Sequence, residues 1–235
     1  MSAPLFYIFP DHSYTDEISL SEETSKHVTQ VLRMKKGEQL DLTDGKGKIW
    51  KGTIADDNRK KCRVHVLESI QLTRSPRQTV IGISPLKNNP RFEWFLEKAT
   101  EIGVASIVPI ICERTEKQRI RKDRMNQILV SAMLQSQQAW LPELQSPCPV
   151  ERLLQETTCS QKFIAFCSEG EKRRLFDAYN PSLGPAVVLI GPEGDFTDAE
   201  ISVAVRSGFL PISLGETRLR SETAGMVAAA LIAGK

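Results

Sequence analysis

The chain has 235 residues, of which 40% are hydrophobic and 26% charged, as expected for a globular protein with one large or two modest domains. The formal net charge of +2 does not by itself indicate nucleic acid, and the basic runs at 46–63, 114–124 and 172–174 are, taken alone, more typical of solvated faces. The number of cysteines is odd and they form no C-x-x-C pair, which argues against a disulfide framework and a zinc site. The histidines lie too far apart for a metal motif, and no apolar stretch is long enough to span a membrane. We therefore expect a cytoplasmic protein.

The first 70 residues predict mostly strands, at 5–9, 40–42, 49–54 and 62–67, with a hairpin turn at Asp44-Gly45. One short helix over 22–34 is expected between them, with Ser21 as its N-cap. These elements predict a compact β-barrel. The polar, proline-containing segment 73–77 reads as a linker, so we place the domain boundary between residues 72 and 73.

From Gln78 onward, strands and helices alternate. Strands are predicted at 80–84, 104–111, 163–167, 186–190 and 209–214, and helices at 91–102, 121–139, 197–207 and 221–233. Gly103 is expected to end the first of these helices. Such alternation predicts a mostly parallel sheet that is covered by helices on both faces.

The most informative stretch is VVLIGPEGDFTDAE, which runs from Val187 to Glu200. An apolar strand ends at Gly191, Gly194 follows in a tight turn, and Thr197 with Glu200 forms a capping box for the next helix. A turn of this kind at the carboxyl edge of a parallel sheet is where open α/β folds bind ligands. On spacing alone, a plain strand-to-helix connection explains the glycines equally well.

A second stretch, LGETRLRSETAGMVAAALIAG, runs from Leu214 to Gly234. Its strand ends at Gly215, and Arg218 and Arg220 come directly before a helix whose expected N-cap is Ser221. Small residues line this helix, so another backbone can approach it closely. By itself the pattern is also that of an alanine-rich packing helix.

Together, IGPEGDF and LGETRLRSETA resemble the signature of the SPOUT methyltransferases, and within them the bacterial family that methylates N3 of a uracil in small-subunit ribosomal RNA. HVTQVLRMKKGEQLDLTDGKG (27–47) resembles the PUA-like first domain of that family. FEWFLEKATEIGVASIVPI (92–110), Gln135-Ser136 and LPEL (141–144) resemble its catalytic half. The resemblance covers nearly the whole chain.

The resemblance implies an α/β fold in which a PUA-like β-barrel, residues 1–72, precedes a trefoil-knotted SPOUT methyltransferase domain with a parallel sheet, residues 73–235. It implies a homodimer that uses S-adenosylmethionine and acts on ribosomal RNA or the small ribosomal subunit. The residues that it places at the cofactor are Ile190, Gly191, Gly194, Leu214, Gly215, Leu219 and Thr223.

The chain departs from the family pattern at several positions. Asp195 stands where the family usually has a second glycine, so the turn must accommodate a side chain. The family commonly has Glu-Gln-Ser-Gly-Arg where this chain has LQSQQ at 134–138, and its usual arginine is displaced from Thr217 to Arg218. The arginine that usually precedes the first strand is absent. These changes bear on RNA contacts more than on cofactor binding.

Two residues are candidates for the chemistry of methyl transfer to uracil N3. A cation near the base stabilises the charge that develops on its carbonyl oxygens, and Arg220 is placed for that role. Glu222 is the candidate proton acceptor, although a first-turn glutamate is more often a helix-dipole partner. RNA contacts are expected from Arg33, Lys35, Lys36, Lys87 and Arg91.

Three other functions remain open. A SPOUT ribose 2′-O-methyltransferase would share the knot, but RSETAGM is unlike the start of its last helix. A non-catalytic RNA-binding adaptor would keep the barrel and need no cofactor loop. A Rossmann-type methyltransferase would need a glycine-rich turn after its first strand, and DGKG at 44–47 lies in a β-rich region instead.

Overall fold

The computed structural model describes residues 3–9, 16–75 and 78–233. Its contacts divide the chain into two compact units. The first unit runs to Arg74 and also includes Met133–Leu141, and the second unit consists of Ser75–Ala132 and the chain from Pro142 onward. Pro76 and Arg77 of the predicted linker lie outside the described residues.

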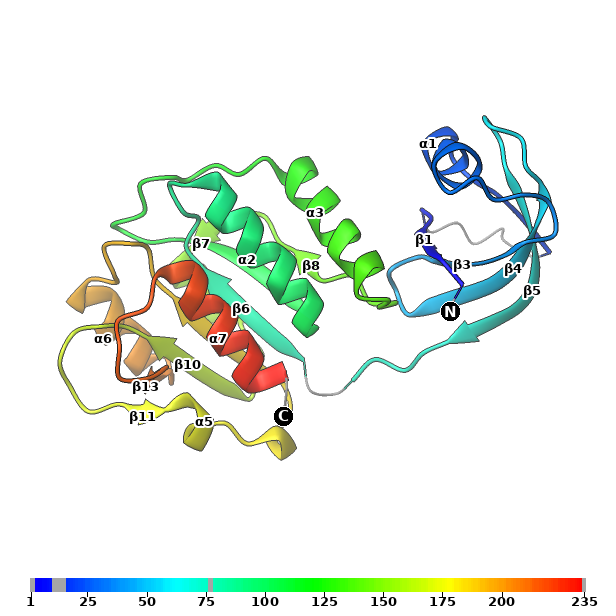
Figure 1. Cartoon of the computed structure of the whole chain (residues 1–235). Coiled ribbons are helices and arrows are strands. Elements are labelled where there is room, and N and C mark those ends of the chain that lie inside the picture. Colours follow the sequence, from blue (N-terminus) through cyan, green and yellow to red (C-terminus); the bar gives the residue numbers. More distant parts are fainter. Residues whose placement is uncertain (1–2, 10–15, 76–77, 234–235) are drawn as a thin grey trace. The chain divides into compact units, whose positions relative to one another are not determined.

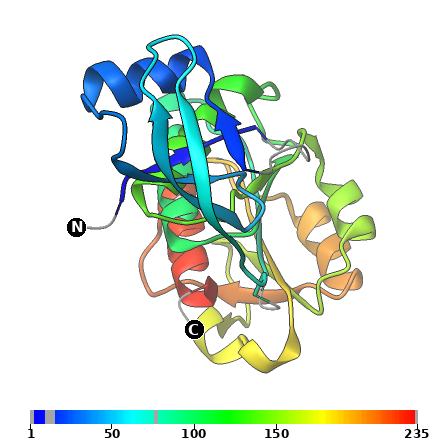
Figure 2. The same cartoon turned by 90° about the vertical axis from the view of Figure 1, so that its right-hand side faces the viewer.

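The first unit contains a five-stranded sheet in the order β1-β3-β4-β5-β2. Its strands are β1 (Leu5–Tyr7), β2 (Glu17–Ser19), β3 (Gln39–Thr43), β4 (Lys48–Asp56) and β5 (Arg63–Gln71). The β1–β3 pair is parallel and the other pairs are antiparallel. Figure 2 shows the long β4–β5 hairpin. Alternate residues point inward from these strands, among them Leu40, Leu42 and Val64, and form the unit's core with Ile18 and Trp50.

The predicted helix over 22–34 is wrong in its length and type. Ser21 caps α1 (Glu22–Lys26) as expected, since its Oγ accepts a hydrogen bond from the Thr24 amide at 3.1 Å. The chain then widens into a π-helix, η1 (His27–Val31), and Arg33 takes a left-handed φ of +56°. Left-handed backbone ends a helix, so Met34 falls outside it.

The segment that follows α3 (Lys122–Gln135) completes the first unit. The Gly47 amide donates to the Ala139 carbonyl at 2.8 Å, and Lys46 pairs with Trp140 in an isolated antiparallel bridge. A Cβ on Gly47 would lie 2.2 Å from Cζ2 of Trp140, and φ of Gly47 is +86°. Only glycine both lacks a Cβ and adopts a positive φ without strain, so the Trp140 indole packs directly on the backbone of the hairpin.

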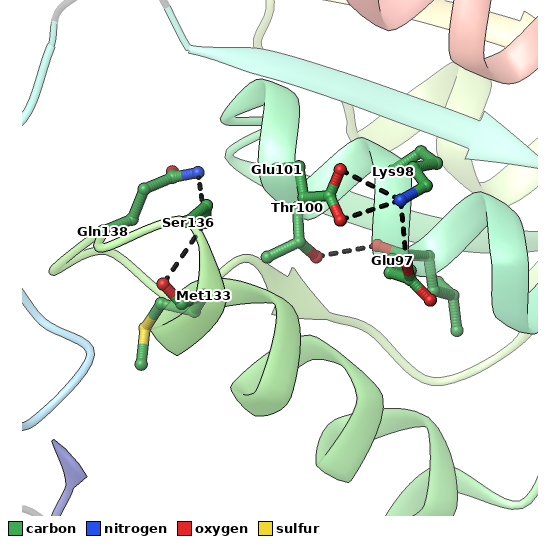
Figure 3. A network of polar contacts seen from close by, with 8 residues as sticks. Glu97, Lys98, Thr100, Glu101, Met133, Ser136 and Gln138 are labelled. Atoms are coloured by element: carbon green, nitrogen blue, oxygen red, sulfur yellow. Dashed lines mark hydrogen bonds and ion pairs between the residues drawn. The ribbon is translucent and has the colours of Figure 1, made fainter. Parts of the chain in front are cut away.

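α3 is shorter than the predicted helix 121–139. Gln137 has a φ of +56°, the Ser136 hydroxyl donates to the Met133 carbonyl, and Gln138 Nε2 donates to the Ser136 hydroxyl (Figure 3). The Ser136 hydroxyl thus bonds a carbonyl in the last turn of α3, where carbonyl groups lack the amide partners that a continuing helix would supply. Gln137 occupies the position at which the family pattern has glycine.

The second unit contains an eight-stranded sheet. Seven strands follow the order β11-β13-β10-β12-β6-β7-β8, β9 pairs with β7, and the described pairings are all parallel. The strands are β6 (Thr79–Ile83), β7 (Ser106–Ile111), β8 (Glu143–Leu144), β9 (Cys148–Pro149), β10 (Gln161–Ala165), β11 (Arg173–Arg174), β12 (Ala186–Ile190) and β13 (Leu210–Ser213). The predicted parallel sheet is confirmed.

Helices cover both faces of this sheet. On one face α2 (Asn89–Ile102) and α7 (Ser221–Ala233) lie side by side, and α7 also contacts β6 and β12 (Figures 1 and 2). Gly103 ends α2 with a φ of +92°, as predicted. Lys98 on α2 pairs with Glu97 and Glu101 at 2.8 and 2.9 Å (Figure 3). On the opposite face, α4 (Val150–Glu156) and α6 (Asp198–Arg206) contribute to a hydrophobic core with Val187 and Leu189 of β12.

The remaining short elements are α5 (Leu175–Ala178) and the 3₁₀ turn η2 (Pro181–Leu183). These two, together with α4 and the short strands β2, β8, β9 and β11, were not predicted. None of the helices in the described part of the chain is long and apolar enough to cross a membrane.

Candidate active site

Three loops of the second unit meet at one edge of the parallel sheet. β13, β10 and β12 are adjacent and parallel, so the loops that follow them emerge side by side. They enclose a cavity of about 780 Å³, lined by residues 165–167 and 172, 190–193 and 195, and 212–222. Arg91 and Ala224 complete the wall. This volume is in the range of cavities that bind small molecules and cofactors.

The turn after β12 is held by Asp195. Its backbone has a φ of +63°, whereas neither Gly191 nor Gly194 has a positive φ. The carboxylate accepts hydrogen bonds from the amides of Cys167, at 2.7 Å, and Phe196, at 2.8 Å. Asp195 therefore ties the turn after β12 to the loop after β10 within the cavity wall.

Of the two glycines in the turn after β12, Gly191 lines the cavity and Gly194 does not. A Cβ on Gly191 would lie 3.0 Å from Cδ2 of the Phe196 ring and 3.2 Å from the Phe196 amide nitrogen. Phe196 is buried, so it cannot move aside freely. Absence of a side chain at this position keeps the turn close against the end of β12.

The same turn is fastened to the loop after β7. Thr197 and Glu200 form the predicted capping box, and the buried Glu200 carboxylate also accepts the Glu113 amide at 2.8 Å. Arg114 Nη1 donates to the Gly194 carbonyl at 2.8 Å. No local sequence pattern predicts this connection, because Arg114 and Gly194 lie 80 positions apart in the chain.

The loop after β13 leads into α7. Ser221 is the first residue of α7, and the Arg220 carbonyl accepts from the Ala224 amide at 2.7 Å, so Arg220 occupies the capping position expected for Ser221. Glu222 is only 7% exposed, and one of its oxygens lies 3.6 Å from Nε of Arg91 on α2. This ion pair joins the starts of α2 and α7.

The structure brings most of the predicted cofactor and catalytic residues into the cavity wall. Ile190, Gly191, Leu214, Gly215 and Leu219 line it, as do Arg220 and Glu222. Two predicted cofactor residues lie elsewhere. Gly194 faces the Arg114 side chain instead of the cavity, and Thr223 lines a smaller adjoining hollow.

The predicted RNA-contacting residues divide between the units. In the first unit, Arg33, Lys35 and Lys36, which we term the 33–36 cluster, are exposed just after η1, and Lys35 lies 3.7 Å from Asp57. In the second unit, Lys87 pairs with Glu116 at 2.9 Å, and this contact raises the pKa of the Lys87 ammonium.

Residues 73–233 match the RNA methyltransferase domain family, and residues 20–67 match the RNA methyltransferase PUA domain family. The ribosomal RNA small subunit methyltransferase E of Mesomycoplasma hyopneumoniae is 31% identical, over 70% of this chain and 73% of its own length. The chain belongs to this family of RNA methyltransferases. The predicted family, the PUA-like first domain and the parallel-sheet methyltransferase domain are thereby confirmed.

Solved structures agree with this assignment. A probable rRNA-methyltransferase from Porphyromonas gingivalis is 38% identical and superposes with a TM-score of 0.90, covering 97% of this chain and 96% of the other. A ribosomal RNA small subunit methyltransferase E from Neisseria gonorrhoeae, bound to S-adenosyl methionine, is 28% identical with a TM-score of 0.86 and the same coverage.

The residues of the cavity fit S-adenosylmethionine. Ile190, Leu214 and Leu219 offer apolar contacts for an adenine ring, and the exposed backbone of the turns offers hydrogen bonds to its polar edge. Glu193 and Glu216 in the wall have the charge that suits the ammonium and sulfonium groups, and Arg218 has the charge that suits the carboxylate. Lys172 also lines the cavity, but its Nζ donates to the Phe166 and Ser168 carbonyls.

Proposed function

We propose that this chain transfers a methyl group from S-adenosylmethionine to N3 of a uridine in small-subunit (16S) ribosomal RNA. The observation that carries the proposal is the cavity at the carboxyl edge of the sheet, with Arg220 and Glu222 in its wall. The relative of known structure that binds S-adenosyl methionine supports the choice of methyl donor. The relatives from Mesomycoplasma hyopneumoniae and Neisseria gonorrhoeae, both named as ribosomal RNA small subunit methyltransferases, support small-subunit ribosomal RNA as the substrate.

S-adenosylmethionine supplies an activated methyl group on a sulfonium. The protein must align the methyl donor and uracil N3 for in-line displacement, and it must keep the other nucleophilic atoms of the RNA away from the methyl group. Uracil N3 carries a proton at neutral pH, and its loss leaves negative charge on the two flanking carbonyl oxygens. The Arg220 guanidinium stabilises that charge as it develops.

Glu222 is placed to hold the proton that leaves N3. Its carboxylate lies at the start of α7, and one oxygen faces Arg91 at 3.6 Å. Because uracil N3 lies on the pairing edge, the base must leave its stack before it reaches these residues.

We further propose that the protein acts as a cytoplasmic homodimer and that its second unit contains the trefoil knot implied by the resemblance. In support of the knot, the chain leaves strand β13 and returns as α7 to the central strands β6 and β12. In support of RNA binding by the first unit, the 33–36 cluster places three exposed basic residues between η1 and β3 of the PUA domain.

The test incubates purified protein with labelled S-adenosylmethionine and small ribosomal subunits from cells that lack this protein. The RNA is then digested to nucleosides, and we expect the label in 3-methyluridine. Label on a ribose or on another base would refute the proposed target. No transfer together with no binding of S-adenosylmethionine would indicate a non-catalytic RNA-binding adaptor.

A further inference from the structure

A second hollow of about 360 Å³ adjoins the candidate active site. It lies between the start of α2 and the start of α7, and its wall includes Asn88, Pro90, Trp94 and Thr223. Arg91, Arg220 and Glu222 line both this hollow and the larger cavity. The two spaces therefore meet at the candidate catalytic residues Arg220 and Glu222 and at Arg91.

Trp94 is the aromatic side chain of this hollow. It is 40% exposed, which leaves a large part of the indole open to a ligand. Trp94 and Arg91 stand three residues apart on α2 and so share one face of the helix. Exposed aromatic rings of this kind bind unpaired nucleobases by stacking.

The charged groups around Trp94 suit a pyrimidine. Two guanidinium groups, from Arg91 and Arg220, can donate hydrogen bonds, and the Glu222 carboxylate can accept one. Uracil presents the matching set on its pairing edge, with an N–H between two carbonyl oxygens. The mixture of charged and polar groups is unlike the core of a protein–protein interface, which is depleted of charge.

We propose that this second hollow is the subsite for the flipped uracil, with Trp94 as its stacking platform. The base enters beside Trp94, and its pairing edge faces the Arg91–Glu222 pair at the boundary of the donor cavity. Arg91 is a positioning residue in this arrangement, because its ion pair with Glu222 fixes the carboxylate. The proposal deepens the proposed function and rests on it.

The test compares Trp94→Ala and Trp94→Phe with the full-length wild-type chain. A matched control is Phe176→Ala, which removes another exposed aromatic side chain of the second unit, from α5, outside both hollows. Steady-state methylation of unmethylated small subunits gives kcat and KM, calorimetry gives the Kd for S-adenosylmethionine, and light scattering gives the mass in solution.

Base stacking on an aromatic ring is worth about 5- to 150-fold in binding, so Trp94→Ala should lower kcat/KM for subunits by a factor in that range. The Kd for S-adenosylmethionine should stay within about twofold of wild type, because Trp94 does not line the donor cavity. Trp94→Phe should recover most of the loss, and Phe176→Ala should resemble wild type.

An unchanged kcat/KM in Trp94→Ala would overturn the subsite, and so would an equal loss of donor affinity. A fall in the mass in solution, with activity restored at higher protein concentration, would instead assign Trp94 to contact with a second copy. If the wild-type chain itself transfers no methyl group to subunits, the proposed function fails, and that outcome is distinct from failure of the subsite.

Discussion

Asp195 provides a quantitative test of how two loops of the cavity wall are held together. Its carboxylate accepts the amides of Cys167 and Phe196, and its backbone is left-handed. Hydrogen bonds to a charged group contribute about 1.5–3 kcal/mol each, and we take the lower end because Asp195 is only half-buried and water can replace part of the interaction. Loss of both bonds then costs about 3 kcal/mol.

Substitutions at Asp195 separate the hydrogen bonds from the backbone cost. Alanine loses both bonds and also keeps the left-handed conformation, which costs roughly 1 kcal/mol more. Glycine loses the bonds without that cost, and asparagine tolerates the conformation and keeps one neutral acceptor. We therefore expect stability to fall in the order Asp, Asn, Gly, Ala.

The assay is thermal unfolding together with calorimetric titration of S-adenosylmethionine. For a chain of this size, about 4 kcal/mol corresponds to a Tm lowered by roughly 8–16 °C in Asp195→Ala. The donor Kd should rise about tenfold, which is 1.4 kcal/mol, because binding must reorder the loop after β10. Glu169→Ala, which removes an exposed carboxylate from that loop, is the control and should change neither quantity.

Two results would refute this reasoning. If Asp195→Ala keeps both the wild-type Tm and the wild-type donor affinity, the two hydrogen bonds do not hold this part of the cavity wall in place. If Asp195→Gly is less stable than Asp195→Ala, the left-handed backbone carries no cost at this position.

Four further measurements test other parts of the structure. Gly191→Ala should weaken donor binding in calorimetry more than Gly194→Ala. A Cβ meets the Phe196 ring at 3.0 Å in the first case, whereas in the second it meets Arg114 at 3.4 Å, close to an ordinary van der Waals distance. Equal effects would contradict the placement of the turn. Arg220→Ala should lower kcat about 10²–10³-fold while the donor Kd changes little, and a matching loss of affinity would argue against a transition-state role. Alanine at all three positions of the 33–36 cluster should make the plot of log K for RNA binding against log salt concentration less steep, by roughly 2 units of slope. An unchanged slope would show that the cluster does not contact RNA phosphates. Burial raises the pKa of the Cys62 thiol from 9.0 to about 11. The thiol therefore ionises at lower pH in the unfolded chain than in the folded one, and the free energy of unfolding should fall as the pH rises from about 9 to about 11. Denaturant unfolding over this pH range should show a smaller fall for Cys62→Ala.

The elements that the sequence predicts best are those with local signals at both ends. β12 and α7 have the predicted bounds, and the Thr197–Glu200 capping box forms as expected. A continuous apolar run marks a buried parallel strand, and a capping box acts over only four residues, so both are visible without knowledge of the fold.

The features that were missed depend on contacts between distant parts of the chain. Arg114 reaches the turn after β12 only because β7 and β12 lie in one sheet, and the two-residue strand β11 exists only as a partner of β13. The π-helix of η1 interrupts a pattern that a regular helix satisfies equally well. Asp195 was visible as a departure from the family pattern, but its bond to the Cys167 amide was not.

The first unit is discontinuous, because Met133–Leu141 supplies the indole that packs on Gly47 and the carbonyl that accepts the Gly47 amide. During synthesis this unit cannot complete its packing when residue 74 leaves the ribosome; it must wait until residue 141 has emerged. By then β6, α2, β7 and α3 of the second unit are also outside the exit tunnel. The hairpin around Gly47 therefore stays without its indole cover while two of the eight strands of the methyltransferase sheet, β6 and β7, and the helices α2 and α3 are already available to fold.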